Sequence, residues 1–181
     1  MALYTFRLFF IPIFLSALVA EAKEHPEKDV RKIDYVLQLT KFIQWPTLTL
    51  APLAPIELCL FATTPEQDAW QALNLREVQN REIQLRIINQ DSQLSQCHIL
   101  FIHKHIPNSI IKKNHYLLVS NSILTIGENK NFARDGGIIE FTLIEDKVDI
   151  KINTQTATEA KLNINANLIE LASSVYSQGQ P

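Results

Sequence analysis

The chain has 181 residues, a formal net charge of −2 and an isoelectric point near 6.2. This near-neutral balance excludes the strongly basic surface that nucleic-acid-binding proteins use. The four glycines, Gly127, Gly136, Gly137 and Gly179, form neither a phosphate-cradling loop nor the Gly-x-Ser-x-Gly elbow of serine hydrolases.

Residues 1–22 have the pattern of a secretory signal peptide. Arg7 supplies the positive charge, residues 8–19 are mostly apolar, and Ala20-Glu21-Ala22 is a small-x-small cleavage pattern. The alternative is an uncleaved membrane anchor, but roughly a dozen apolar residues are fewer than the ~20 that a spanning helix needs. We therefore expect export with cleavage near Ala22, a flexible segment over 23–29, and a single domain after it.

Cys59 and Cys97 are the only two cysteines of the chain. An exported protein meets an oxidising compartment, so we expect these two residues to form a disulfide bond. The alternative is two separate buried thiols. Closing a loop of about 39 residues stabilises a fold by roughly 4 kcal/mol in the chain-entropy model. Two cysteines this far apart lack the close ligand pairs of zinc motifs, so no metal is expected there.

The first part of the domain is predicted to be a helix, a connector and a strand. Apolar residues at helical spacing predict an amphipathic helix from Asp29 to Trp45. They are Ile33, Val36, Leu37, Thr40 and Ile43. Pro46 ends this helix, and three prolines stiffen the connector over 46–55. The apolar run over 56–62 predicts a buried strand, and a short helix over 65–75 follows.

The middle of the chain alternates between strands and short helices. Residues 82–88 alternate apolar and polar side chains, which predicts a half-exposed strand near an edge. The uninterrupted apolar runs over 99–102 and 123–126 predict two buried strands. A short helix is expected over 107–114, whereas 116–120 fits neither pattern. This alternation favours an α/β arrangement with a largely parallel sheet.

The last part of the chain changes character. Alternating apolar residues over 139–143 and 148–152, separated by Glu145-Asp146, predict an antiparallel hairpin. Helical spacing over 168–175 predicts a C-terminal amphipathic helix before a tail over 177–181. The fold class is therefore α/β: a single domain with a mostly parallel central sheet, flanking helices, and a C-terminal antiparallel hairpin plus helix.

Candidate chemistry is sparse, and we expect no catalytic residues. His103 and His105 lie two apart and could hold a metal with a third ligand. The simpler interpretation is that both lie at the exposed end of the strand over 99–102, because Lys104 between them indicates a solvated loop.

The segment before the hairpin is the candidate partner surface, because exposed loops are where recognition residues collect. Its candidate residues are Phe132, Arg134, Asp135, Gly136 and Gly137. The two adjacent glycines are expected to allow the backbone to make a tight turn or to approach a neighbouring group closely.

Several segments together resemble the YfiR family in order and spacing. They are 42–46 with Trp45 and Pro46, the strand with Cys59, 97–102, 123–127, 136–141, 150–153 with Asn153, Leu162, and 168–172 with Leu168 and Leu171. The resemblance covers about residues 30–176.

The resemblance implies a periplasmic, non-enzymatic regulator without a cofactor. Such a protein represses an inner-membrane diguanylate cyclase, or a related sensor, by binding its periplasmic part, and so controls cyclic-di-GMP. An outer-membrane lipoprotein that relieves repression is a further partner implied. Apart from the resemblance, a homodimer stays open as a partner. Cys59 and Cys97 fall where one family disulfide would lie, but a second family cysteine pair is missing, and Ala62 stands where a glycine often ends the first strand.

Two other functions stay open from the residues alone. Parallel α/β sheets bind ligands at strand ends, which suits a periplasmic small-ligand binding module for sensing or uptake. A metal hydrolase would use His103 and His105.

Overall fold

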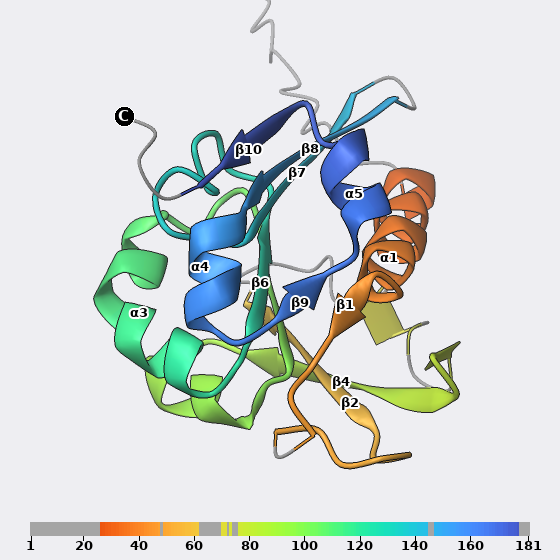
Figure 1. The fold of residues 1–181 in the computed structure, drawn as a ribbon. Coiled ribbons are helices and arrows are strands. Elements are labelled where there is room, and N and C mark those ends of the chain that lie inside the picture. The colour runs from red at the N-terminus through yellow and green to blue at the C-terminus, as the bar shows by residue number, and fades with distance from the viewer. Residues whose placement is uncertain are drawn as a thin grey trace, which may run out of the picture.

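The computed structural model describes residues 26–47, 49–61, 70–71, 73, 76–144 and 147–177. A main sheet is flanked by helices (Figure 1). Its strands are β2 (Ile56–Phe61), β3 (Glu77–Val78), β4 (Arg81–Ile88), β5 (Ile99–Ile102), β6 (Leu124–Gly127), β7 (Ile139–Ile144), β8 (Lys147–Asn153) and β10 (Ser174–Tyr176). The helices are α1 (Pro26–Thr40), the 3-10 helix η1 (Asp91–Gln96), α3 (Ser109–Ser120), α4 (Thr154–Glu159) and α5 (Ala166–Leu171).

The main sheet is mostly parallel, as predicted. Its eight strands run in the order β10-β8-β7-β6-β5-β2-β4-β3. The pairs β2–β4, β2–β5, β5–β6, β6–β7 and β8–β10 are parallel, whereas β3–β4 and β7–β8 are antiparallel. The predicted strands and the antiparallel hairpin are confirmed. The single α/β domain expected from the sequence is therefore the observed fold class.

The sheet divides the core into two parts, because successive side chains of a strand point to opposite faces. On one face, Leu58, Leu60 and Phe101 belong to a cluster that α1 joins through Ile33 and Val36. On the other face lies a second cluster, which η1 and α3 cover. It includes Phe61, Leu94, Leu100, Ile102, Ile111 and Leu118. Figure 1 shows α1 and α3 on opposite sides of the strands.

The first helix differs from its prediction at both ends. It begins at Pro26 rather than at Asp29 and stops at Thr40 rather than before Pro46. Proline suits a first helical position because its missing N–H has no partner there anyway. The helix stops early because Gln79 Nε2 donates to the carbonyl of Lys41 and to that of Ile43, both at 3.1 Å.

Ile43, expected on the apolar face of that helix, instead belongs to a strand. β1 (Ile43–Gln44) pairs antiparallel with β9 (Asn163–Ile164), and Ile43 lies opposite Ile164. Its partner lies about 120 residues away along the chain, and local periodicity carries no information about such a partner. The prediction that Ile43 belongs to the helix was therefore wrong.

The last predicted helix is shorter than expected. α5 ends at Leu171, and Val175 lies in β10, opposite Ile152 of β8. The open edge of β8 supplies backbone partners that a helix would lack: the N–H of Ser173 donates to the carbonyl of Ile150 at 2.9 Å. The prediction of a helix through Val175 was therefore wrong.

Two helical segments need separate comment. α3 is longer than expected and includes 116–120, which the sequence left unassigned. Most of the helix expected over 65–75 lies outside the described residues, as do the signal peptide and Ala62. In the described part of the chain, no helix combines the length and the apolar character needed to cross a bilayer.

The connection from β6 to β7 is built around Phe132. Its ring is fully buried and lies between Gly127 and Gly137. A Cβ at Gly137 would lie 2.1 Å from Phe132 Cε1, and a Cβ at Gly127 would lie 2.4 Å from Cδ2. Gly136, at φ +106°, makes the turn that follows. Both expected uses of the glycine pair, a tight turn and a close approach, are confirmed.

This arrangement predicts that Gly137→Ala destabilises the fold. Overpacking a buried site costs about 1–3 kcal/mol, and the new Cβ would overlap the buried ring of Phe132. Urea unfolding of the wild type, Gly137→Ala, Phe132→Ala and the double variant measures the effect. We expect Gly137→Ala to cost less once the ring is gone. Equal costs with and without the ring would contradict the close-packing explanation.

Candidate functional site

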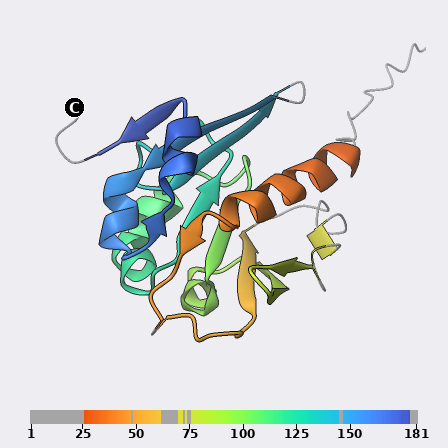
Figure 2. The same cartoon turned by 45° about the vertical axis from the view of Figure 1, so that its right-hand side comes forward.

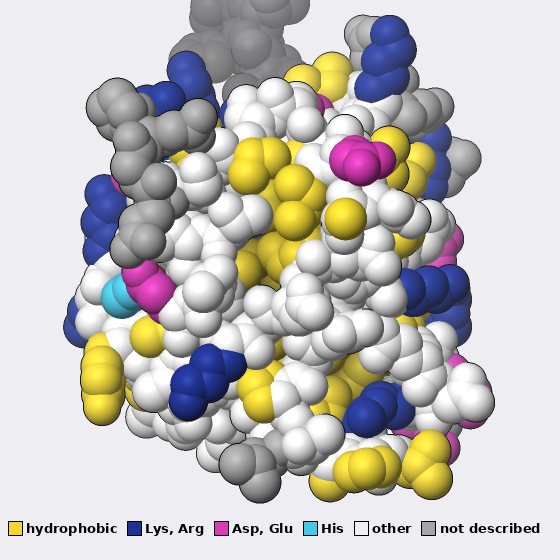
Figure 3. Space-filling view, viewed as in Figure 1, with side chains coloured by type: hydrophobic (Ala, Val, Ile, Leu, Met, Phe, Trp, Pro, Cys, Tyr) yellow, Lys and Arg dark blue, Asp and Glu magenta, His cyan; other side chains and the backbone are white. Residues whose placement is uncertain are grey.

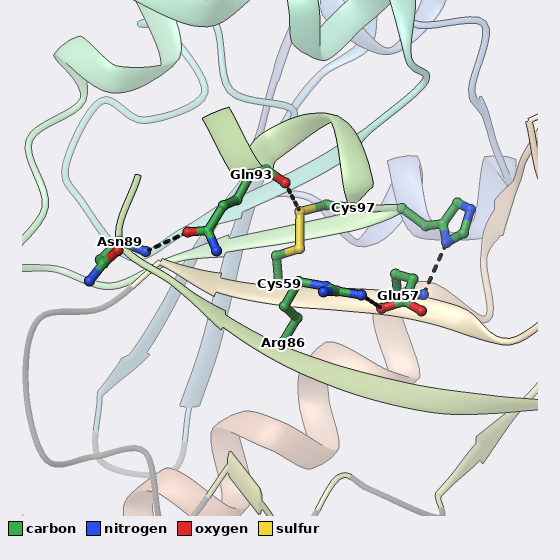
Figure 4. The surroundings of a disulfide bond; sticks show 7 residues. Glu57, Cys59, Arg86, Asn89, Gln93 and Cys97 are labelled. Carbon is green, nitrogen blue, oxygen red and sulfur yellow. Dashed lines mark hydrogen bonds and ion pairs between the residues drawn. A yellow bond between two sulfur atoms is a disulfide. The ribbon is translucent and has the colours of Figure 1, made fainter. Parts of the chain in front are cut away.

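The expected disulfide is present (Figure 4). Cys59 lies in β2 and Cys97 lies just before β5, with their Cα atoms 5.6 Å apart. Both side chains are buried, being 0% and 3% exposed. Nearby, Arg86 of β4 forms an ion pair with Glu57 of β2 at 3.3 Å. The bond therefore joins neighbouring core strands.

His98, next to the disulfide, is held in its neutral form. Its Nδ1 accepts a hydrogen bond from the N–H of Glu57 at 3.0 Å. An acceptor nitrogen carries no proton, so this contact requires neutral imidazole. Burial is the main cause that lowers the pKa of His98.

His103 is buried at the carboxyl end of β5, and the expectation that it is exposed was wrong. It is 2% exposed, and its Nε2 lies 3.4 Å from Oε2 of Glu128, the residue after β6. Lys32 of α1 contacts the other oxygen of Glu128 at 3.0 Å. Burial lowers the pKa of His103 more than Glu128 raises it. Three elements far apart in the sequence thus bring the Lys32–Glu128 ion pair beside the buried side chain of His103.

His105 is exposed, as expected, and its ring centroid lies 5.0 Å from that of His103. Within the described residues, no group of three or more His, Cys, Asp or Glu side chains could hold a metal ion. Two surface hollows stand out in this part of the chain, one of about 320 Å³ beside Cys97 and His98 and one of about 260 Å³ beside α4 and Ser177. They are at or below the lower limit of typical ligand pockets.

The candidate partner surface lies on the loop between β6 and β7. Arg134 is exposed, and its guanidinium carbon lies 6.0 Å from the ring centroid of Tyr176. Asp135 and Gly136 are half-buried, and Lys112 of α3 pairs with Asp135 at 2.8 Å. A hydrogen bond from Lys112 is the main cause that lowers the pKa of Asp135.

The other two candidates on this loop are buried. Phe132 and Gly137 lie inside the fold, so their assignment to an exposed surface was wrong. An aromatic residue in a loop can point inward or outward, and the sequence pattern does not distinguish the two. The surface of the loop is therefore Arg134 with parts of Asp135 and Gly136.

Polar side chains that the sequence analysis missed support this loop from beneath. Glu140 is 2% exposed, and its carboxylate accepts hydrogen bonds from Lys151 Nζ at 2.7 Å and from the N–H of Ala133 at 3.3 Å. The bond to Glu140 raises the pKa of Lys151. Glu140 and Lys151 are opposite each other in the hairpin. Opposite charges across a predicted hairpin were the signal that could have revealed them.

Asn153, one of the resemblance residues, supports the same loop. Its Nδ2 donates to the carbonyl of Ala133 at 2.7 Å, and its Oδ1 accepts from the N–H of Thr156 at 2.9 Å. The Asn153 side chain therefore caps the N-terminus of α4 and also holds the loop at Ala133. Both backbone groups of Ala133 are satisfied by side chains of the hairpin.

The remaining resemblance residues are spread over the fold. Trp45 and Pro46 are half-buried in the connector before β2, and the Nε1 of Trp45 is buried without an acceptor among the described residues. Leu168 is buried in α5, whereas Leu171 is 72% exposed. These four residues lie in the connector and in α5, and none of them lines either of the two hollows.

Removal of the disulfide is expected to destabilise the domain without changing its fold. The Cys59→Ala, Cys97→Ala double variant should lose up to about 4 kcal/mol of unfolding free energy, because the unfolded chain gains loop entropy. Urea unfolding followed by circular dichroism measures the loss. The wild type, unfolded without reductant, should not react with a thiol reagent. Labelling of both cysteines in that unfolded sample would contradict the bond.

The domain should lose stability as the pH falls through about 6.5. Burial lowers the pKa of both His98 and His103, so the unfolded chain takes up protons first and the stability contributed at higher pH is lost. The thermal unfolding midpoint should therefore be lower at pH 5.5 than at pH 7.5. A His98→Gln, His103→Gln variant should show a smaller difference between the two pH values. An unchanged difference in this variant would argue against the two histidines.

A comparison with one solved structure supports the fold, and a family model assigns the family. A crystal structure of a conserved domain protein from Vibrio cholerae O1 biovar El Tor str. N16961 has a TM-score of 0.51 at 9% identity, covering 81% of this chain. The ABC domain in complex with L-Trp from Streptococcus pneumonia has a TM-score of 0.45 at 9% identity, with the same 81% covered. The chain spans 60% of the length of each of these structures.

Sequence comparison is more specific than this likeness of fold. No curated protein sequence matches the chain. A family model described as YfiR/HmsC-like matches residues 30–173, which is more than half of the chain. The protein therefore belongs to the YfiR/HmsC-like family.

Proposed function

We propose that the protein is a periplasmic regulator that represses an inner-membrane diguanylate cyclase, or a related sensor, by protein–protein contact. The observation that carries the proposal is the family match over residues 30–173, which at family level supports a periplasmic regulator of cyclic-di-GMP signalling. The protein acts by binding, without catalytic residues or a cofactor of its own. An outer-membrane lipoprotein that competes for it would relieve the repression.

The N-terminal pattern supports export to the periplasm. In this proposal residues 1–22 are removed near Ala22, and the mature chain starts at Lys23. The disulfide between Cys59 and Cys97 suits an oxidising compartment. Because both sulfurs are buried, we assign the bond a structural role rather than a regulatory one.

The exposed part of the loop between β6 and β7 is the proposed contact with the membrane partner. Arg134 is presented to solvent, while Phe132 below it is packed between two glycines. Glu140 and Asn153 hold the backbone of the loop at Ala133. A loop held in this way loses little conformational entropy on binding, which favours recognition by contact.

Deletion of the gene is expected to raise cyclic-di-GMP severalfold, and a plasmid copy of the wild-type gene should restore the original level. An Arg134→Glu variant should restore it only in part, because the exposed guanidinium of the contact loop is replaced by a carboxylate. A Lys41→Glu variant, with the same charge change after α1, should restore it fully. Mass spectrometry of cell extracts measures the nucleotide. Unchanged cyclic-di-GMP in the deletion strain would overturn the proposed function.

Cross-linking in the periplasm would identify the partner itself. Cells that carry a photoreactive residue at position 134 are irradiated, and the adducts are identified by mass spectrometry. The proposal expects an inner-membrane protein with a cyclase or sensor domain. Adducts to transport proteins alone would favour a role in uptake instead.

A further inference from the structure

The connector between β1 and β2 contains a tight turn with an unusual residue in it. The N–H of Ala54 donates to the carbonyl of Ala51 at 3.1 Å, which closes a four-residue turn with Pro52 and Leu53 at its centre. Proline has a negative φ, and Leu53 has φ +62°. This is the φ pattern of a type II turn, whose third residue is ordinarily glycine or asparagine.

Leucine in this left-handed conformation is strained, because its Cβ approaches the backbone too closely. The strain is not offset by packing, since Leu53 is 78% exposed. Of the five other non-glycine residues with positive φ in the described part of the chain, Gln79 binds carbonyls after α1, and Ser122 is within 3.4 Å of Thr49 Oγ1. Leu53 therefore has two costs in the isolated domain, backbone strain and an apolar side chain in water.

The turn is nevertheless held in place. Arg81, at the start of β4, donates from Nη1 to the carbonyl of Ala51 at 2.7 Å and to the carbonyl of Ala54 at 3.2 Å. These two carbonyls flank the tip on both sides. The buried side chain of Leu50 anchors the segment just before the turn. Leu53 thus projects from a braced turn.

The turn projects at one end of the molecule. The connector runs along the bottom of Figures 1 and 2, whereas β7 and β8 extend toward the top. Figure 3 shows apolar side chains at this bottom end. Ala51, Pro52 and Leu53 are three consecutive exposed residues without a charge. An uncharged, braced apolar tip fits an apolar pocket.

We propose that Leu53 is an anchor that inserts into an apolar pocket on the periplasmic part of the membrane partner. This inference rests on the proposed function and adds a second contact to it. The occupant is a protein rather than a lipid surface, because one leucine and one proline bury too little apolar surface to hold a domain on a bilayer. Bracing by Arg81 means that little conformational freedom is lost when the pocket closes over the tip.

The test separates binding from folding through the strain itself. Leu53→Asn keeps a side chain of similar size that tolerates positive φ but is polar, and Leu53→Gly removes the strain altogether. Both variants should keep or raise the thermal unfolding midpoint. Leu53→Met keeps an apolar side chain. Tyr116→Gln is the matched control, because Tyr116 is 83% exposed on α3.

Each variant is expressed in the deletion strain and cyclic-di-GMP is measured. We expect Leu53→Asn and Leu53→Gly to leave the nucleotide near the deletion level, and Leu53→Met and Tyr116→Gln to restore it. A photoreactive residue at position 53 should cross-link to the same membrane protein as one at position 134. Full restoration by Leu53→Asn would overturn the inference, as would cross-linking only to a second copy of this chain or to lipid.

Three further outcomes separate the inference about Leu53 from the proposed function. A midpoint several degrees lower in both Leu53→Asn and Leu53→Gly would assign Leu53 to the fold and overturn the inference. If the deletion itself leaves cyclic-di-GMP unchanged, the proposed function fails. If the deletion raises it and every variant restores it, only the inference about Leu53 fails.

Discussion

Three neighbouring parallel strands, β2, β5 and β6, must be covered on both faces, and the rest of the fold depends on this constraint. Their side chains are almost entirely apolar, with Leu58, Phe101 and Leu124 on one face and Phe61 and Leu100 on the other. Only a layer of structure on each side can keep water from both faces. α1 covers one face, η1 and α3 cover the other, and the disulfide ties β2 to the residue before β5.

Because the centre of the sheet is apolar, polar interactions concentrate at its ends and in the connections. At the carboxyl ends of β5 and β6, the Lys32–Glu128 ion pair lies beside the buried side chain of His103. In other α/β proteins this edge is where ligands bind. Here buried side chains of this chain occupy part of that edge. The connections beyond it are braced by single polar side chains, Glu140 and Asn153 under one loop and Arg81 under another.

This distribution suits a protein that acts through contact. A braced loop offers a fixed surface, so the partner does not have to supply the free energy that orders it. Arg134 and Leu53 are exposed on two such loops, one charged and one apolar. The likeness to solved structures establishes the fold alone, whereas the family match gives the class of function.

The sequence by itself determined the α/β class, the core strands, the hairpin, the disulfide and the family, because these features depend on patterns that are local or on a single cysteine pair. Apolar runs such as 99–102 are buried in any compact fold that contains them. Tertiary structure decided where α1 stops, that Val175 joins β8, and that Phe132 and His103 are buried. For α1, Val175 and His103 the deciding partner is distant along the chain, whereas Phe132 packs between two nearby glycines. Residue spacing carries no information about either kind of contact.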